Sequence, residues 1–142
     1  MKRGFTLIEI IVVIIIVGIL AAVGLSQYSA TVEKSRLAEA KVRIGAMRQL
    51  AYQYYLENGS LTGVQNADVG VDSTCASTGF YSYAIGDYGT NANLTATRCT
   101  SGGKTPNASR LYYYYMTYYP GTGQSDWRCR YDDFSPCFGL PI

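Results

Sequence analysis

The sequence contains no histidine, and none of its four cysteines forms a CxxC pair. Histidine is the commonest general base and metal ligand in proteins, and closely spaced cysteine pairs are typical of structural zinc sites. No paired catalytic carboxylates and no nucleophile with its base stand out, and the GGKT segment at residues 102–105 lacks the first glycine of a P-loop. The sequence therefore predicts no catalytic site, no metal and no cofactor, and it disfavours an enzyme.

Charged residues are also scarce, because they make up 15% of the chain and give a formal net charge of only +2. No basic run is longer than Lys2-Arg3, so the cationic surface that nucleic-acid binders present to phosphates is missing. Asp126, Asp132 and Asp133 lack the spacing of an EF-hand calcium loop and are expected to be solvated loop residues. No specific nucleic-acid partner is predicted.

The 142 residues fall into two parts of different composition. This length fits one modest domain plus an anchor. Apolar residues crowd the first 25 positions, whereas Gly, Ser, Thr, Asn and Tyr dominate after Gly59. An even number of cysteines in a small, loop-rich domain predicts two disulfides formed in an oxidising compartment. All four lie in the second part: Cys75, Cys99, Cys129 and Cys137.

Residues 5–25 are apolar or glycine except for Thr6 and Glu9. About 20 such residues are enough to cross the hydrocarbon core of a membrane as a helix. Lys2 and Arg3 directly precede the segment, so the positive-inside tendency places the N-terminus in the cytoplasm. The cysteine-bearing part then lies outside, in agreement with the predicted disulfides.

Glu9 is the residue that a plain membrane anchor does not explain. A carboxylate in the bilayer core is costly unless it is neutralised, hydrated or paired. The only basic side chains near the span are Lys2 and Arg3, so a cut after Gly4 would make the new amine of Phe5 the nearby positive group. That amine, on the same or a neighbouring subunit, is the expected partner of Glu9; the alternative is a carboxyl group that is protonated or reaches the interface.

The segment GFTLIE at residues 4–9, followed by the apolar residues 10–25, resembles the prepilin signature shared by type IV pilins and type II secretion pseudopilins. The resemblance implies that a membrane aspartyl prepilin peptidase cuts between Gly4 and Phe5, that Phe5 becomes N-methylated, and that Glu9 helps dock a subunit onto the growing filament. It implies as partners other copies of the chain, minor pilins, the peptidase and an inner-membrane assembly platform. Removing residues 1–4 would take away two of the 12 basic side chains and leave them equal in number to the 10 acidic ones.

Two details of the apolar segment bear on this resemblance. Gly18, Ala21 and Ala22 match the small residues usual in the family, and such residues let apolar helices approach closely. Where pilins commonly carry a proline ahead of Gln-Tyr, this chain has Ser26 before Gln27. Proline would break one backbone hydrogen bond and bend the helix, so no fixed kink is expected at this position.

Residues 30–57 are rich in helix formers, and Asn58-Gly59 is a good helix stop. Joined to the apolar segment, they predict about 50 residues of helix, roughly 75 Å long. Glu39 and Arg43 stand at a favourable i,i+4 spacing on its charged face. The apolar stripe that should pack on the rest of the domain is Ala40, Ile44, Met47, Ala51 and Tyr54.

The part after Gly59 has strand-like runs at residues 79–85 and 111–119 and the start of another at 126–130, which predict three or four antiparallel strands. Alternation places Tyr112 and Tyr114 on one face of a strand and Tyr113 and Tyr115 on the other, one pair against the helix and the other facing a neighbouring subunit or water. As in many pilins, Cys129 and Cys137 would bound a C-terminal loop, leaving Cys75 to pair with Cys99. The sequence alone leaves two other connectivities open.

These observations lead to an α+β, pilin-like fold, in which a long membrane-spanning helix packs against a small antiparallel sheet with a disulfide-bounded C-terminal loop. The expected divisions are a cleaved cytoplasmic leader (1–4), a membrane or filament-core segment (5–28), an amphipathic helix (29–58) and an extracellular β-rich head (59–142). The expected function is that of a structural subunit of a type IV pilus serving motility, adhesion or DNA uptake. The chain would lie in the inner membrane before assembly and in an extracellular pilus afterwards.

Two alternatives stay open from the sequence. The first is a type II secretion pseudopilin, which would form a periplasmic pseudopilus. The second is a monomeric membrane-anchored surface binding protein, whose Tyr-rich head captures a ligand and whose N-terminus is never processed. Failure to cut before Phe5 would favour the second.

Overall fold

The computed structural model describes residues 4–140 and divides the chain into two compact units, Met1–Ser35 and Arg36–Ile142. Helix α1, Leu7–Asn58, contributes residues to both units. The second unit also contains four strands: β1 (Tyr81–Asp87), β2 (Ala92–Arg98), β3 (Tyr112–Tyr119) and β4 (Gln124–Tyr131). Most of the predicted leader, including Lys2 and Arg3, lies outside the described residues.

The first unit is the N-terminal part of α1. The β-branched residues that fill positions 10–17 lower helix propensity in water. In hydrocarbon the requirement is different, because every backbone N–H and C=O must find a partner within the segment, and a helix provides one. Among residues 4–140, α1 is the one helix long and apolar enough to cross a membrane, with a mean hydropathy of 3.1 over its most apolar window. Its 52 residues match the predicted length, and it continues through position 26.

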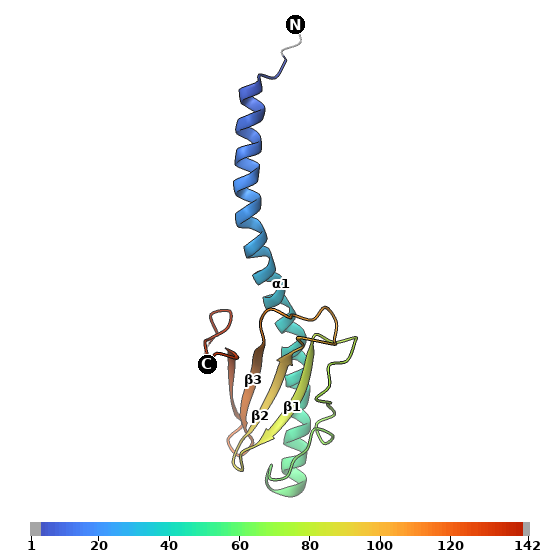
Figure 1. Ribbon diagram of the computed structural model, residues 1–142. Coiled ribbons are helices and arrows are strands. Elements are labelled where there is room, and N and C mark those ends of the chain that lie inside the picture. Colours follow the sequence, from blue (N-terminus) through green and yellow to red (C-terminus); the bar gives the residue numbers. More distant parts are fainter. Residues whose placement is uncertain (1–3, 141–142) are drawn as a thin grey trace. The chain divides into compact units, whose positions relative to one another are not determined.

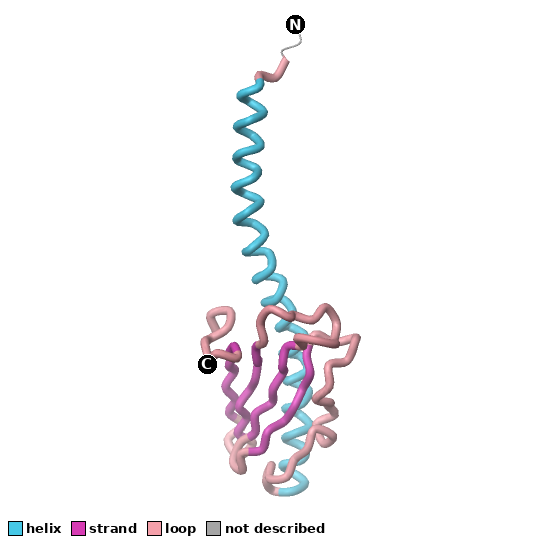
Figure 2. Tube along the Cα trace, viewed as in Figure 1, coloured by secondary structure: helices cyan, strands magenta, loops and turns pink. Residues whose placement is uncertain are grey.

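The second unit is an antiparallel sheet packed on the C-terminal part of α1. The strands lie in the order β1-β2-β3-β4, each paired with the next along the chain. Figure 1 views the sheet from the face opposite the helix, and Figure 2 shows the loops that join the strands. β2 is not among the predicted strand-like runs, because its Ala and Asn residues have low strand propensity. With β2 the sheet reaches the upper end of the predicted three or four strands.

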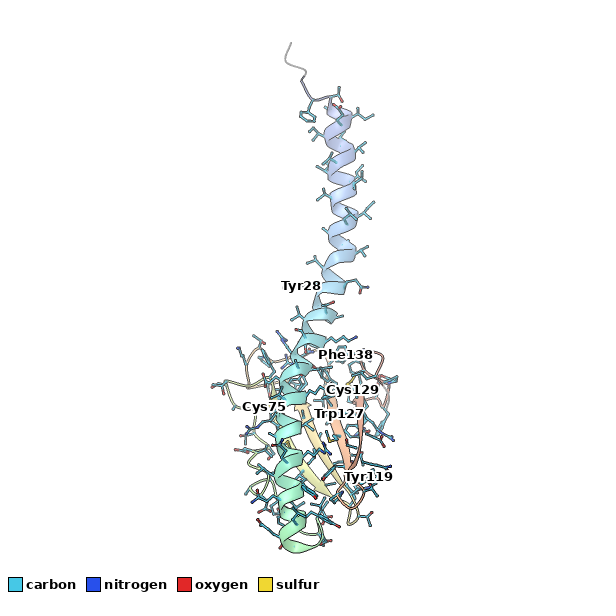
Figure 3. All side chains as sticks on the ribbon, turned by 180° about the vertical axis from the view of Figure 1, so that it is seen from behind. Tyr28, Cys75, Tyr119, Trp127, Cys129 and Phe138 are labelled. Atoms are coloured by element: carbon cyan, nitrogen blue, oxygen red, sulfur yellow. A yellow bond between two sulfur atoms is a disulfide. The ribbon has the colours of Figure 1, made fainter. Side chains whose placement is uncertain are left out.

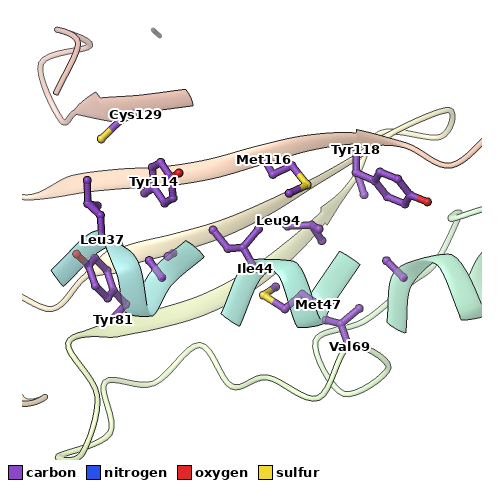
Figure 4. Packing of buried hydrophobic residues seen from close by; sticks show 14 of the residues in the cluster. Leu37, Ile44, Met47, Val69, Tyr81, Leu94, Tyr114, Met116, Tyr118 and Cys129 are labelled. Carbon is purple, nitrogen blue, oxygen red and sulfur yellow. The ribbon is translucent and has the colours of Figure 1, made fainter. Parts of the chain in front are cut away.

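The core of the second unit lies between α1 and one face of the sheet (Figure 4). In the predicted stripe, Ala40, Ile44, Met47 and Ala51 are no more than 1% exposed, and Tyr54 packs at the margin of the cluster. Leu94 and Met116 meet this stripe from the sheet. The predicted packing of the helix on the head is confirmed.

The aromatic strand β3 alternates as predicted. Tyr112 and Tyr114 are buried, while Tyr113 and Tyr115 are half-buried on the opposite face. Both buried tyrosines contact other aromatic residues. Tyr114 stacks on Trp127 with ring centroids 5.1 Å apart, and the Tyr112 hydroxyl forms a 2.8 Å hydrogen bond with that of Tyr81. The inner face of the sheet is therefore an aromatic core, and the outer face is left to other contacts.

Caps and disulfides fix the ends of these elements. The N–H of Gly59, which has φ +74°, donates to the Tyr55 carbonyl at 2.8 Å, and this confirms the predicted helix stop at Asn58-Gly59. Disulfides join Cys75 to Cys99 and Cys129 to Cys137 (Figure 3). The second disulfide bounds the C-terminal loop, so the predicted α+β architecture with this loop is confirmed.

Candidate functional site

The first candidate site is the start of α1, where Thr6 and Glu9 form a capping box. Glu9 Oε2 accepts two hydrogen bonds from Thr6, one from its N–H and one from its hydroxyl, both at 2.7 Å. The N–H of Glu9 in turn donates to the Thr6 hydroxyl oxygen at 3.4 Å and to the Thr6 carbonyl at 3.1 Å. A carboxylate in the first turn also suits the partial positive charge of the helix N-terminus.

Thr6 is a site residue that the sequence prediction passed over. The signal was present, because Thr6-Leu7-Ile8-Glu9 has the TxxE spacing of a capping box directly before an apolar helix. The consequence is that Glu9 has a polar partner within its own chain. The carboxylate is held at the helix terminus by the residue that directly follows Phe5.

Gly4 and Phe5 lie just before α1, in a segment without regular secondary structure. The side chain of Phe5 is 83% exposed, and a Cβ at Gly4 would meet no described atom within 4 Å. Peptidases bind their substrates in extended conformations rather than as helices. The peptide bond proposed for cleavage is therefore outside the helix and open to approach.

An apolar surface surrounds the helix beyond this terminus. Between residues 7 and 25 the large apolar side chains are each 41–78% exposed in the single chain. Figure 3 shows these side chains projecting outward around the helix. Soluble monomers rarely expose a continuous apolar surface of this extent, which marks a membrane or protein interface.

Two charged residues of α1 hold the connection between α1 and β1. A carboxylate oxygen of Glu39 accepts hydrogen bonds from the Phe80 N–H at 3.2 Å and the Tyr83 hydroxyl at 3.3 Å, and Arg43 donates to the Gly70 carbonyl at 2.8 Å. Burial, reinforced by the Glu39 carboxylate, raises the pKa of Tyr83 well above its ordinary value. Glu39 and Arg43 therefore hold the loop in addition to standing at the predicted i,i+4 spacing.

The acidic residues near the C-terminus do not converge. Asp126 lies on β4, whereas Asp133 lies in the C-terminal loop and accepts hydrogen bonds from both the N–H and the hydroxyl of Ser135. Across residues 4–140, no three His, Cys, Asp or Glu side chains are grouped so that they could hold a metal ion. Asp133 therefore has a local role in the loop, whereas Asp126 is a strand residue and not the loop residue that the sequence predicts.

Comparisons with known proteins agree with this geometry. A family model described as the prokaryotic N-terminal methylation motif matches residues 1–25. Fimbrial protein EcpC of Eikenella corrodens is 36% identical over 101 residues, which cover 71% of this chain and 65% of that protein. Type IV major pilin protein PilE of Neisseria gonorrhoeae is 37% identical over 81 residues, 57% of this chain and 48% of that protein.

A third relative, type IV major fimbrial protein FimA of Dichelobacter nodosus, is 32% identical over 90 residues, which cover 56% of this chain and 58% of that protein. The chain thus spans between about half and two thirds of the length of these curated relatives. The methylation motif, the long apolar helix and the disulfide-bounded antiparallel head occur together with these matches. These matches support the type IV pilin family for this chain, and the relatives are named as pilin and fimbrial proteins rather than enzymes.

Proposed function

We propose that this chain is the subunit of a type IV pilus, cut between Gly4 and Phe5, methylated at Phe5 and assembled through its N-terminal helix. The observation that carries the proposal is the exposed apolar surface of residues 7–25, which contains a single charged side chain, Glu9. Such a surface needs lipid before assembly and other helices after it. The names of the relatives, major pilins and fimbrial proteins, support a filament rather than a monomeric anchor.

Glu9 is proposed to dock the amine of Phe5, on the same or a neighbouring subunit. Methylation leaves this amine cationic, so it can form a charge-assisted hydrogen bond to the carboxylate. In an apolar filament core the attraction is stronger than in water, and an unpaired carboxylate there would be unfavourable. The Thr6 hydrogen bonds keep Glu9 oriented until that partner arrives.

The proposed topology follows from the leader. Lys2 and Arg3 keep residues 1–4 in the cytoplasm, residues 5–28 form the membrane or filament-core segment, and the head of residues 59–142 lies outside. The amphipathic helix of residues 29–58 joins the two. The partners would be the prepilin peptidase, the inner-membrane assembly platform, minor pilins and other copies of this chain. The pilus would serve motility, adhesion or DNA uptake.

Mass spectrometry of a sheared extracellular filament fraction tests processing and assembly together. We expect abundant protein that begins at methylated Phe5 and has the mass of a chain with two disulfides. A processed chain that stays in the cell envelope would instead favour a pseudopilin or a minor pilin. An uncut chain beginning at Met1 would overturn the filament proposal in both forms.

Three variants separate the docking role of Glu9 from its role as a helix cap. Glu9→Ala removes both, Glu9→Gln removes the charge but keeps an oxygen that can accept the Thr6 hydrogen bonds, and Thr6→Val removes the capping hydroxyl but keeps the charge. We expect all three to be cleaved and inserted in the membrane, and only Thr6→Val to yield filaments. Filaments from Glu9→Gln together with none from Thr6→Val would show that the cap, not the charge, is what assembly needs.

A further inference from the structure

The outer face of the sheet, opposite the helix, contains a groove of about 360 Å³. Figure 1 looks onto this face. The groove runs across β1, β2 and β3, and its floor is formed by small or hydroxyl-bearing residues, among them Ala84, Thr95 and Thr97. Tyr88 lines one side, where a Cβ at Gly86 would come within 3.3 Å of its ring, and Tyr113 with Tyr115 line the other. Aromatic rings therefore flank a floor of modest polarity.

The floor offers hydrogen-bonding groups that the head does not use. Within residues 4–140, the hydroxyls of Thr95 and Thr97 make no hydrogen bond to another protein group. The side-chain oxygen of Asn93 accepts the Thr117 hydroxyl at 2.9 Å, which fixes the amide and leaves its NH2 group as a donor. Two hydroxyls and an oriented amide suit a ligand that carries several hydroxyl groups.

One cation, Arg130, lines the groove. The central carbon of its guanidinium lies 4.9 Å from the centroid of the Tyr113 ring and 4.5 Å from that of Phe134. No carboxylate of the described chain lies within 4 Å of it. Phe134 has φ +62°, a conformation rare for a bulky residue. An arginine that contacts aromatic rings still has N–H groups that can donate to a carboxylate.

We propose that this groove binds an acidic saccharide, with the sugar ring between the tyrosines and its carboxylate on Arg130. One face of a pyranose is a patch of C–H groups that packs on aromatic rings, while its hydroxyls fit the Thr and Asn side chains of the floor. A volume of this size is within the usual range for small-ligand sites and accommodates a sugar residue. A nucleic-acid strand would require a row of cations, whereas a single arginine lines the groove.

The test measures sugar binding to the full chain in micelles of a detergent without a sugar headgroup, by saturation-transfer NMR with titration. Methyl glucuronide is the probe, and methyl glucoside, which lacks the carboxylate, is the neutral control. A short oligothymidylate represents nucleic acid. We expect the glucuronide to bind at least about tenfold more tightly than the glucoside, since a charge-assisted hydrogen bond contributes more than a neutral one.

Four variants locate the site. Arg130→Gln should remove the preference for the glucuronide, and Thr97→Val, which keeps shape and charge, should weaken both sugars severalfold. Arg128→Gln is the matched control, because Arg128 lies two residues away on the same strand and face but does not line the groove. Tyr88→Ala, in an exposed loop, should weaken both sugars without affecting the fold.

Trp127 fluorescence verifies that each variant is folded, because Trp127 packs on Tyr114 in the core. Any of three results would overturn the proposal: no saturation transfer to either sugar, equal losses from Arg128→Gln and Arg130→Gln, or tighter binding of the oligothymidylate than of the glucuronide. None of these results bears on cleavage or filament assembly. The groove and the pilus subunit are therefore tested separately.

Discussion

Arg98 is a buried cation that joins separate segments of the head. It is 1% exposed and donates to the Phe80 carbonyl at 2.9 Å and to the Thr105 carbonyl at 2.7 Å. Its guanidinium also lies against the rings of Phe80 and Tyr81. Through these contacts one side chain connects β2, the approach to β1 and the loop that follows Cys99.

Replacing Arg98 with methionine should destabilise the head by about 2 to 4 kcal/mol, because the hydrogen bonds from this buried guanidinium to the Phe80 and Thr105 carbonyls are lost. The measurement is urea unfolding of the full chain in detergent, followed by the fluorescence of Trp127, the only tryptophan. Arg128→Met, at an exposed position of the same sheet, should shift the midpoint little. Equal midpoints for the two variants would contradict the role given to Arg98.

Two surface carboxylates should make the head less stable in acid. Asp87 accepts the N–H groups of Gly89 at 2.7 Å and Gly63 at 2.9 Å, and these bonds hold its pKa below the ordinary value. Hydrogen bonds from Ser135 lower the pKa of Asp133 in the same way. Since both pKa values are lower in the folded chain, the unfolded chain binds more protons in acid. Their stabilisation is present above about pH 4 and is lost as the pH falls further.

Asp87→Asn tests this dependence. The variant should be less stable than the parent near about pH 6 and should lose less stability between about pH 4 and pH 2, because one of the titrating groups is gone. Urea midpoints at a series of pH values, read from Trp127 fluorescence, provide the measurement. Parallel curves for parent and variant would rule out the contribution of Asp87.

At the level of elements, the two disulfides close loops of different length. Cys75 and Cys99 are separated by 24 positions, and Cys129 and Cys137 by 8. Chain entropy predicts a stabilisation of about 3.5 kcal/mol for the longer loop and about 2.6 kcal/mol for the shorter. We expect Cys75→Ser with Cys99→Ser to lower the urea midpoint more than Cys129→Ser with Cys137→Ser. The reverse order would show that loop entropy is not the dominant effect.

The helix and the strands differ in how well they can be predicted from their local sequence. Helix α1 could be predicted because its apolar run, its stripe and its Asn58-Gly59 stop are all local signals. Strand β2 could not, since its buried Ala92 and Ala96 have low strand propensity and depend on the pairing of both neighbouring strands. The burial of Arg98 was beyond prediction for the same reason, because its carbonyl partners come from distant segments.

The candidate sites show the same contrast. Gly4, Phe5 and Glu9 follow one another in a specific motif, so they could be named from the sequence. The groove on the outer face could not, because Tyr88, Thr97 and Arg130 come together only through the register of four strands. Local motifs predict sites within one segment, while sites formed across a sheet require the fold.

At the scale of the whole molecule, a substitution at Gly18 can distinguish folding of the single chain from packing of helices in a filament. A Cβ at Gly18 would meet no described atom outside its own helix within 4 Å, so Gly18→Leu should leave the subunit folded and inserted. In a filament the larger side chain would hold neighbouring helices apart, at a cost on the order of 1 kcal/mol for each contact. We expect processed subunits but few filaments in the sheared fraction, whereas Ile19→Leu should assemble normally. Normal assembly of Gly18→Leu would place Gly18 outside the subunit contacts.

The C-terminal loop has a consequence for how copies of the chain meet. β4 is an edge strand of the sheet. The loop closed by Cys129 and Cys137 folds back on this strand, where Pro136 pairs with Arg130 and the Cys137 N–H donates to the Cys129 carbonyl. An uncovered edge strand has unpaired backbone groups to which a strand of another chain can add, and such pairing leads to aggregation. By pairing with part of that edge, the loop leaves fewer free backbone groups on β4 to which a strand of another chain could add.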